Sequence, residues 1–209
     1  VSPLNTYGAT KLLMEKLFVS ANNYVNPKKH LTKFISVRYG NVFGSSGSVV
    51  PRFIEQIKKK QKITITDPKM TRFSITMNEA LDFILSATNS GKGSEIFVPK
   101  MRAYNIMDLK DAFYELFENY GENIIGIRPG EKLHEVLIGD DEIRQSWEFN
   151  QMFMITNPLY PLFHVNKINE SYPDIKKIEN IKNYSSDIAE KISKEELKKM
   201  IKDSGLIDL

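Results

Sequence analysis

Residues 34–66 read FISVRYGNVFGSSGSVVPRFIEQIKKKQKITIT, and this stretch decides the fold class. Its first four residues are apolar or small and rich in β-formers, which is typical of a strand in a covered parallel sheet. A loop rich in glycine follows, then a helical apolar spacing over 50–60 and a second strand pattern over 63–66. This order of elements predicts an α/β fold with a mainly parallel sheet, in which ligands bind beyond the carboxyl ends of the strands.

The same alternation continues on both sides of this stretch. Toward the N-terminus, Asn5 precedes a helix predicted over 7–23, whose wide apolar face indicates that it is largely buried. Thr76 with Glu79, and later Ser193 with Glu196, form capping boxes that predict two more helix starts. The remaining elements are expected as strands over 95–98 and 122–127 and as a helix that Asp108 caps and that runs through Tyr120.

Composition excludes several classes of protein. The chain has 209 residues, 41% of them hydrophobic, and no apolar run approaches the roughly 18 to 20 residues that a membrane span needs. A formal charge of +3 is too small to predict binding to nucleic acid. There is no Cys, and His30, His134 and His164 lack metal-ligand spacing, so no metal site is expected. These features predict a cytoplasmic globular protein that binds neither nucleic acid nor membrane.

The strongest local signal is Tyr7-Gly8-Ala9-Thr10-Lys11. On a helix, a separation of four residues places two side chains on one face, roughly 5 to 6 Å apart at Cβ. The Lys11 ammonium would there stabilise the phenolate of Tyr7, which makes this tyrosine a candidate acid or base. Any helix can contain this pair by chance, so a purely structural role stays open for it.

Four motifs resemble those of extended short-chain dehydrogenases/reductases. Residues 2–11 resemble the YxxxK element, 37–44 (VRYGNVFG) a strand-end motif whose Asn touches a nucleotide-sugar, and 70–76 (MTRFSIT) an element whose Arg holds a phosphate. Residues 128–135 (RPGEKLHE) complete the set, and the likeness continues into Trp147-Glu148-Phe149 and the tail. In this order the motifs resemble the inverting UDP-N-acetylglucosamine 4,6-dehydratases of flagellin and capsule synthesis. Related retaining, membrane-anchored enzymes usually carry Met where Tyr7 stands.

The resemblance implies a lyase that uses NADP (or NAD). Hydride leaves the C4 atom of the sugar and later returns to C6 after loss of water, with inversion at C5, while Tyr7 moves the C4 hydroxyl proton and Lys11 orders the nicotinamide ribose. The implied catalytic residues are therefore Tyr7 and Lys11. The implied cofactor-binding residues are Tyr7, Lys11, Tyr39, Gly40, Asn41 and Val42. The implied residues for UDP-N-acetylglucosamine or a related UDP-sugar are Asn41, Ser48, Val49, Val50, Arg72, Arg128 and Glu131.

The chemistry of individual side chains supports the binding of a sugar nucleotide independently of the resemblance. Arg72 and Arg128 carry forked donors that suit phosphates, and Asn41 offers a donor and an acceptor to a sugar. Each residue also has a plain structural interpretation, as a surface charge or a loop-capping amide. Glu131 either binds a ribose hydroxyl or belongs to the first turn of a following helix. Aromatic residues such as Tyr39, Trp147 and Phe149 are expected to belong to the core more often than to a nucleotide pocket, and Trp147 is left out of the site.

The resemblance also implies a domain organisation. Residues 1–98 are expected to be the C-terminal part of an NAD(P)-binding Rossmann-like domain, with 45–74 reaching into the substrate domain. Residues 99–164 are expected to form a small α/β domain for the UDP-sugar, and 165–209 a helical tail whose balanced charge suits a solvated appendage or, alternatively, a partner-binding arm. No G-x-G-x-x-G occurs, and the Asp-Lys pair that the family places just before the Tyr is absent. We therefore expect a C-terminal portion of an enzyme that is inactive alone and homo-oligomeric at full length.

Two other functions stay open from the sequence. A UDP-hexose 4-epimerase of the same fold would share Tyr7, Lys11, Asn41 and both arginines. Alternatively, the chain binds a sugar nucleotide without performing chemistry on it.

Overall fold

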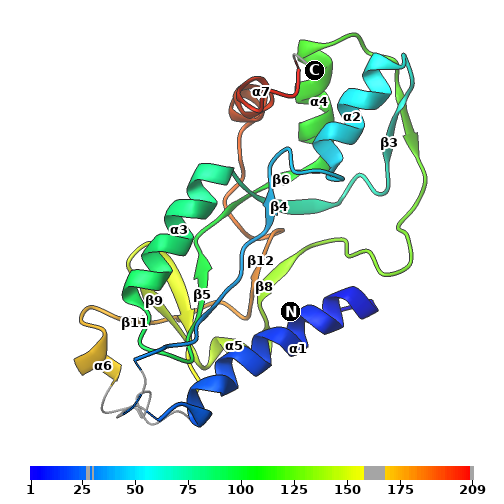
Figure 1. Ribbon diagram of the computed structural model, residues 1–209. Helices are drawn as coiled ribbons and strands as arrows, with labels where there is room; N and C mark the ends of the chain where they lie inside the picture. The colour runs from blue at the N-terminus through cyan, green and yellow to red at the C-terminus, as the bar shows by residue number, and fades with distance from the viewer. Residues whose placement is uncertain (27–28, 30, 158–167, 208–209) are drawn as a thin grey trace. The chain divides into compact units, whose positions relative to one another are not determined.

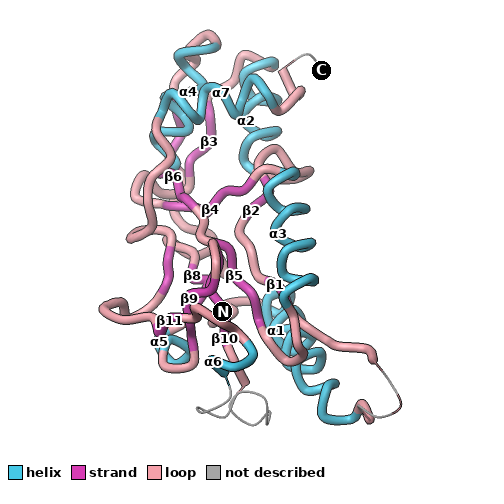
Figure 2. The backbone as a smooth tube through the Cα atoms, turned by 90° about the vertical axis from the view of Figure 1, so that its left-hand side faces the viewer, coloured by secondary structure: helices cyan, strands magenta, loops and turns pink. Residues whose placement is uncertain are grey.

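A computed structural model of the chain describes residues 1–26, 29, 31–157 and 168–207. The chain divides into two compact units, each made of three segments. Unit 1 consists of residues 1–39, 81–100 and 136–184, and unit 2 consists of residues 40–80, 101–135 and 185–209. Figures 1 and 2 show the elements of both units. The assignment of Rossmann-like, substrate-binding and tail functions to stretches of the chain stays a prediction.

Unit 1 is built on a five-stranded sheet with the order β1-β5-β10-β9-β11. Its strands are β1 (Ser36–Val37), β5 (Ile96–Pro99), β9 (Ser146–Phe149), β10 (Met152–Ile155) and β11 (Lys176–Lys177). Its helices are α1 (Thr6–Ala21), η1 (Asn22–Tyr24), α5 (Asp140–Ile143) and α6 (Ile168–Ser171), and β8 (Val136–Ile138) also belongs to it. All residues of β5 and β10 are buried, and Phe83 and Tyr172 pack into the same core. The division between the units falls within α3 (Met77–Ser90) and within β12 (Tyr184–Ser185).

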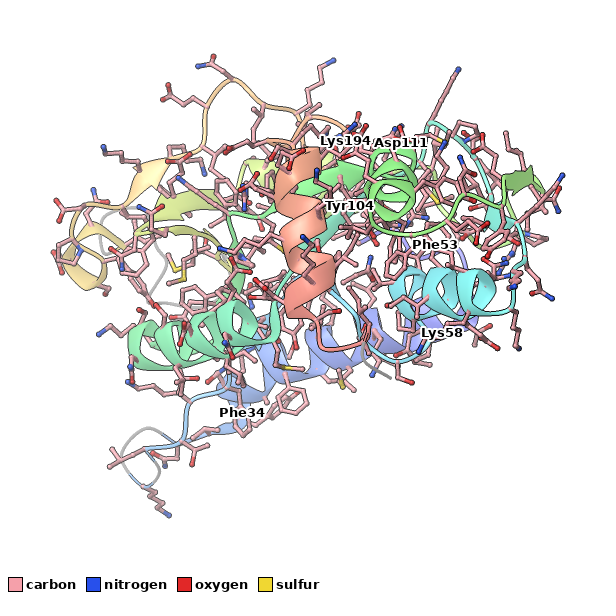
Figure 3. The ribbon with its side chains drawn as sticks, turned by 90° about the horizontal axis from the view of Figure 1, so that it is seen from above. Phe34, Phe53, Lys58, Tyr104, Asp111 and Lys194 are labelled. Atoms are coloured by element: carbon pink, nitrogen blue, oxygen red, sulfur yellow. The ribbon has the colours of Figure 1, made fainter. Side chains whose placement is uncertain are left out.

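Unit 2 combines a three-stranded sheet, β2-β4-β6, with a parallel pair, β3 and β7. Its strands are β2 (Asn41–Val42), β3 (Ile63–Ile65), β4 (Thr71–Ile75), β6 (Arg102–Asn105) and β7 (Glu122–Ile124). Its helices α2 (Val49–Lys58), α4 (Ile106–Leu116) and α7 (Lys194–Asp203) share one core, in which Phe53 and Phe113 meet edge to face at 5.7 Å. Figure 3 labels Phe53 on α2, and Asp111 and Lys194 where α4 and α7 lie side by side.

The α/β class is confirmed, and the sheets are mixed. Strand pairs β1/β5, β2/β4 and β3/β7 are parallel, whereas β5/β10, β9/β10, β9/β11 and β4/β6 are antiparallel. One cause is a tight hairpin between β9 and β10, where Asn150 takes a positive φ of 53°. Asn tolerates that conformation better than most residues, and a two-residue turn joins only antiparallel strands.

Helix starts follow the predicted chemistry with one exception. The Asn5 side chain accepts from the N–H of Gly8, and both predicted capping boxes are present at Thr76–Glu79 and Ser193–Glu196. The prediction that Asp108 caps α4 was wrong, because Asn105 is the cap and accepts from the N–H of Met107. Asp108 lies in the first turn of that helix instead, where a carboxylate suits the positive end of the dipole. The helix ends at Leu116, four residues before the predicted end.

The prediction that the first helix is largely buried was also wrong. Val19 is the one buried residue within α1, and the side chains of Leu13 and Leu17 are 61% and 62% exposed. The spacing of Leu13, Met14, Leu17 and Phe18 places them on one side of the helix, and all four are exposed. The spacing therefore predicted the helix correctly, while its burial depends on contacts that spacing does not specify.

Candidate functional site

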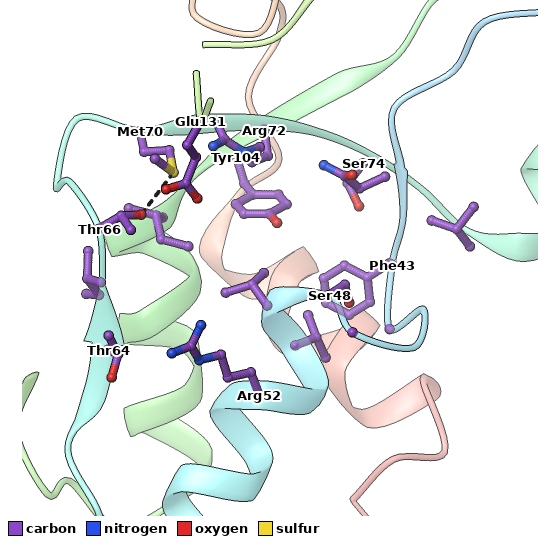
Figure 4. A pocket seen from close by; sticks show the side chains of 18 of the residues that line it. Phe43, Ser48, Arg52, Thr64, Thr66, Met70, Arg72, Ser74, Tyr104 and Glu131 are labelled. Carbon is purple, nitrogen blue, oxygen red and sulfur yellow. Dashed lines mark hydrogen bonds between the residues drawn. The ribbon is translucent and has the colours of Figure 1, made fainter. Parts of the chain in front are cut away.

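A cavity of about 240 Å³ lies within unit 2 (Figure 4). Its walls come from β2 and the glycine-rich loop, the first turns of α2, strands β3, β4 and β6, and the loop 128–131. All seven residues predicted to bind the UDP-sugar line it: Asn41, Ser48, Val49, Val50, Arg72, Arg128 and Glu131. Val42, predicted to touch the cofactor, lines the same cavity. The structure therefore brings together residues that lie up to 90 positions apart.

One wall of the cavity is the start of α2. Ser48 is its N-cap, but the Ser48 side chain makes no capping bond, and its buried Oγ has no partner among the described residues. The first N–H groups of a helix have no intrahelical acceptor. Because Pro51 has no N–H, the free donors of this turn are the backbone amides of Val49 and Val50. A positive dipole end with such donors is favourable for an anion.

The opposite wall is one face of the β2-β4-β6 sheet. The register pairs Asn41 with Ser74 and Arg72 with Tyr104. Residues 72 and 74 share a face because side chains alternate along a strand, so these four polar side chains stand side by side. Ser74 Oγ is buried and has no partner among the described residues. Burial raises the pKa of Tyr104, so its phenol stays protonated and can donate a hydrogen bond.

Backbone carbonyls hold Arg72 in place. Its Nη1 donates to the carbonyls of Thr71 at 2.7 Å and Leu133 at 3.1 Å, and its Nη2 donates to the carbonyl of Lys132 at 2.8 Å. Its Nε lies 3.8 Å from a carboxylate oxygen of Glu135. Carbonyls fix the orientation of a guanidinium without cancelling its charge, so Arg72 keeps a positive charge at the cavity wall.

The loop that carries Arg128 and Glu131 is a tight turn. The N–H of Glu131 donates to the carbonyl of Arg128 at 3.0 Å, and the Glu131 carboxylate accepts from the N–H of Arg128 at 3.3 Å. No helix follows Glu131 in this described stretch, so the interpretation of this residue as part of a helical first turn was wrong. The next regular element is strand β8.

A hydroxyl network anchors the end of this loop to β4. Thr71 Oγ1 lies 2.8 Å from Nδ1 of His134 and 2.7 Å from Oγ of Ser186. The N–H of Glu135 donates to the same Ser186 oxygen at 2.9 Å. This network fixes residues 134 and 135 against the strand that carries Arg72. His134 is therefore part of the scaffold of the cavity.

Glu135 is the residue of this region that sequence reasoning missed. It belongs to the quoted motif 128–135, yet the motif alone gave it no role. Its Oε1 accepts from Nδ2 of Asn41 at 2.8 Å, and its Oε2 accepts from the N–H of Phe73 at 2.9 Å. Burial raises the pKa of Glu135, and Arg72 and these two hydrogen bonds oppose the rise. Only the folded arrangement of three segments reveals this contact.

Several residues that line the cavity itself were also missing from the prediction. Arg52 lies four residues after Ser48 on α2, so helical spacing could have indicated it. Ser74 and Tyr104 required the strand register, which the sequence did not supply. The further residues that line the cavity and were not predicted are Phe43, Gly44, Gly47, Thr64, Ile65, Thr66, Met70 and Ile106.

The predicted Tyr–Lys pair lies in unit 1. Tyr7 and Lys11 occupy the first turns of α1, and Lys11 Nζ is 5.4 Å from the centroid of the Tyr7 ring. The ammonium and the phenol therefore share one face of the helix, as the spacing predicts. Tyr7 is 72% exposed, which leaves it accessible to a ligand.

Two residues predicted to touch the cofactor have packing contacts of their own. Tyr39 meets Phe83 edge to face at 6.3 Å within unit 1. A Cβ on Gly40 would lie 2.4 Å from Cβ of Phe73, so this position needs glycine for the close approach of two strands. Neither residue lines the cavity. Their predicted cofactor contacts stay predictions.

Trp147 and Phe149 lie on β9 of unit 1, where Trp147 Nε1 donates to Thr156 Oγ1 and Phe149 meets Tyr172. Across the ranges that the structure describes, no cluster of His, Asp and Glu could hold a metal ion, and His30 and His164 lie outside those ranges. In the same ranges, the structure contains no helix with the length and hydrophobicity to cross a membrane.

Sequence comparison assigns the chain to a known protein family. The protein family described as "Polysaccharide biosynthesis protein" matches residues 1–157. The chain belongs to this family. A family member from Campylobacter jejuni, named UDP-N-acetylglucosamine 4,6-dehydratase (inverting), is 42% identical over 89% of the chain and 55% of its own length. The resemblance stated from the motifs is thereby confirmed.

Three further proteins show the range of the likeness. An uncharacterized membrane protein of Methanocaldococcus jannaschii is 42% identical over 97% of the chain and 59% of its own length. A UDP-glucose 4-epimerase of Rickettsia massiliae is 34% identical over 96% of the chain and 58% of its own length. The X-ray structure of Pen from Bacillus thuringiensis matches with a TM-score of 0.82 and 40% identity, over 99% of the chain and 59% of that protein. The chain thus spans less than two thirds of each of these proteins.

Proposed function

We propose that this chain supplies the nucleotide-sugar site and the Tyr–Lys pair of a UDP-N-acetylglucosamine 4,6-dehydratase that inverts C5. The observation that carries the proposal is the cavity of unit 2, which gathers all seven residues predicted for the UDP-sugar. Its chemistry suits a ligand that carries both a diphosphate and a sugar. The identity of 42% with an inverting dehydratase supports the same reaction.

The cavity residues have distinct tasks in this proposal. Arg72, Arg128 and the amides of Val49 and Val50 bind the diphosphate, because each offers N–H donors in a positive field. Asn41 contacts the hexose. Glu131 accepts from a ribose hydroxyl, as a carboxylate can do at neutral pH.

Tyr7 and Lys11 carry the proton chemistry. Tyr7 takes the proton of the C4 hydroxyl as that carbon is oxidised, and the adjacent Lys11 ammonium binds a ribose hydroxyl. Their exposed, cation–π-paired arrangement fits the nicotinamide-ribose end of a cofactor, NADP or NAD. When bound, that cofactor supplies acceptance and return of a hydride. No G-x-G-x-x-G occurs among the 209 residues, so we propose that turnover requires a dinucleotide-binding segment in addition to them.

The test has two stages. Calorimetric titration of the 209-residue chain with UDP and with UDP-N-acetylglucosamine should show binding of both, and an absence of heat from a folded sample would refute the site. A protein that also carries the dinucleotide-binding segment should then form a 4-keto-6-deoxy sugar, with activity lost in Tyr7→Phe. Mass spectrometry and NMR of the product decide the reaction.

A second candidate is a UDP-hexose 4-epimerase, which the 34% identity with a UDP-glucose 4-epimerase favours. It would use the same cavity residues and the same Tyr–Lys pair. A product that differs from the substrate only at C4 would establish it in place of the dehydratase. Binding of the UDP-sugar without any product in that assay would indicate a binding protein.

Location and assembly belong to the same proposal. We expect the protein in the cytoplasm and as a homo-oligomer, to be checked by cell fractionation and by light scattering coupled to size exclusion.

A further inference from the structure

The orientation of the Asn41 side chain follows from its contact with Glu135, and this inference rests on the proposed function. Asn41 stands at the start of β2 on the cavity wall, and its Nδ2 donates to Oε1 of Glu135 at 2.8 Å. A carboxylate accepts hydrogen bonds and donates none when ionised. The neighbour therefore selects one of the two orientations that an amide can take.

Glu135 is itself fixed on both sides. Its second oxygen accepts from the N–H of Phe73 in β4 at 2.9 Å. Its own backbone N–H donates to Oγ of Ser186, and its carbonyl accepts from the N–H of Ser186 at 2.8 Å. Side chain and backbone are thus both anchored to residues outside the loop 128–135. A carboxylate held this way presents Oε1 to Asn41.

We propose that Glu135 is a positioning residue that turns the Asn41 amide so that Oδ1 accepts a hydrogen bond from a hydroxyl of the hexose. With Nδ2 turned toward Glu135, Oδ1 is the acceptor that Asn41 presents to a ligand in the cavity. The site is then specific for a UDP-hexose with a free hydroxyl at that position. A sugar that lacks this hydroxyl, or carries an ether there, leaves the oxygen without a donor.

Arg72 separates this effect from phosphate binding. Its guanidinium is held by three backbone carbonyls at 2.7 to 3.1 Å, while Glu135 is 3.8 Å away. Neutralising Glu135 therefore leaves the geometry of Arg72 unchanged. The expected effect falls on the hexose and spares UDP.

A polarity swap tests the proposal. In Glu135→Gln, one oxygen remains for the N–H of Phe73, but an NH2 group now faces Asn41, so the Asn41 amide turns over and presents its donor to the ligand. In Asn41→Asp, two carboxylates face each other. In the combined variant Glu135→Gln/Asn41→Asp, the introduced amide donates to the introduced carboxylate, whose other oxygen again accepts from the ligand.

The measured quantities are dissociation constants for UDP and UDP-N-acetylglucosamine. We expect each single variant to bind UDP-N-acetylglucosamine about 5- to 10-fold more weakly, the size of one hydrogen bond. The combined variant should return to within about threefold of wild type on the same scale. The combined variant keeps the net charge of wild type and should bind UDP within about twofold of wild type, and Glu135→Gln should bind UDP no more weakly than wild type does. The matched control is Glu55→Gln, an exposed carboxylate on α2 outside the cavity, which should bind both ligands as wild type does.

The outcomes separate this proposal from the proposed function. If wild type binds neither ligand, the nucleotide-sugar site itself is refuted, and the inference falls with it. If wild type binds both but Glu135→Gln binds them equally well, only the inference is overturned. Losses that simply add in the combined variant overturn it too, because independent residues show no rescue.

A further measurement tests the proposal on wild type, so its result does not depend on whether the variants fold. The 3-deoxy, 4-deoxy and 6-deoxy forms of UDP-N-acetylglucosamine are titrated in turn. One of them should bind at least about fivefold more weakly than the parent sugar, and Glu135→Gln should remove that difference where it folds. Equal affinity of wild type for the parent and all three analogues overturns the proposal.

Discussion

Unit 2 contains its cavity and the core that supports it, whereas unit 1 holds the Tyr–Lys pair on a helix with little packing of its own. In unit 2, helices α2, α4 and α7 bury Phe53, Leu109 and Leu197 completely beside the cavity. In unit 1, α1 buries Val19 alone. A binding site needs several groups at fixed distances, and a packed core provides them. The helix that carries Tyr7 instead depends on a few polar contacts.

The largest effect is expected at Arg38, which joins α1 to the rest of unit 1. Its guanidinium donates to Glu15 of α1, to Glu142 of α5 and to the carbonyl of Leu137, and its side chain is 9% exposed. Burial opposes its charge, but the hydrogen bonds with both carboxylates prevail and raise the pKa of Arg38. Arg38→Met would remove the buried cation between these two carboxylates and leave only the exposed Lys16 beside them, at a cost of about 3 to 5 kcal/mol.

Urea unfolding and hydrogen exchange measure that loss. Exchange should accelerate in α1, while unit 2 should still bind UDP if the two units are as different as described. Lys16→Met is the control, because Lys16 is exposed and lies only at the edge of the same carboxylates. Loss of UDP binding in Arg38→Met would show that the cavity depends on unit 1.

A smaller effect is expected at Arg72 in unit 2, which is proposed to bind the diphosphate. Arg72→Lys replaces a fork held by three carbonyls with a single point charge. Because hydrogen bonds to charged groups contribute about 1.5 to 3 kcal/mol, UDP affinity should fall by roughly 10- to 100-fold. Calorimetry measures it, with Arg102→Lys on the neighbouring strand β6 as control. Unchanged affinity for UDP would remove Arg72 from the site.

Ser74 should respond in the opposite direction. Its buried hydroxyl has no partner among the described residues, so Ser74→Ala removes an unsatisfied polar atom. The free energy of unfolding of the ligand-free protein should rise by about 1 kcal/mol. Ser186→Ala is the matched control and should be destabilised, since Ser186 Oγ is bonded to Thr71 and Glu135. Thermal unfolding decides the sign, and destabilisation by Ser74→Ala would contradict the prediction.

The smallest effect is expected when the pH is lowered, which weakens the ion pairs that hold helix α7. Hydrogen bonds from Lys194 and Lys198 lower the pKa of Glu115 to about 2, and those from Arg102 and Ser193 lower the pKa of Glu196 to about 2. A carboxylate whose pKa is lower in the folded state stabilises it above the unfolded value, near 4.5, and loses that contribution as pH falls toward 2. The protection factors of the α7 amides, which correct for the slower intrinsic exchange in acid, should therefore fall between pH 5 and roughly pH 2.5.

Salt provides the check on that prediction. These pairs are partly exposed, so 1 M NaCl should reduce the pH effect through screening, with a Debye length of about 3 Å. A pH effect that persists in 1 M NaCl would contradict the prediction, because it would assign the weakening of α7 to buried groups and not to these ion pairs.

Local sequence signals predicted where helices begin more accurately than they predicted which helices are buried. Asn5, Thr76 with Glu79, and Ser193 with Glu196 act on N–H groups within three residues, so their role is visible in the sequence. The cap of α4 was missed because Asn105 and Asp108 are both good candidates in one short stretch. The burial of α1 depends on distant neighbours and was predicted incorrectly.

The same distinction holds for the site. Arg72, Arg128 and Asn41 were predicted because their motifs resemble a known family and their side chains suit phosphates and sugars. Ser74 and Tyr104 required the register of three strands. Glu135 required a contact between residues 94 positions apart. Contacts of that kind leave no local signal in a single sequence.

The division of each unit into three segments affects how the protein folds. The chain passes between the units five times, and unit 2 is complete only when residues 185–209 join it. Leu197 and Ile201 fill a core whose other members lie up to about 150 positions earlier in the chain. Contacts between such distant residues slow folding, because long loops must close before burial compensates for their entropy. During synthesis the core of unit 2 therefore stays incomplete until α7 has left the ribosome, and its apolar residues need protection from aggregation until then.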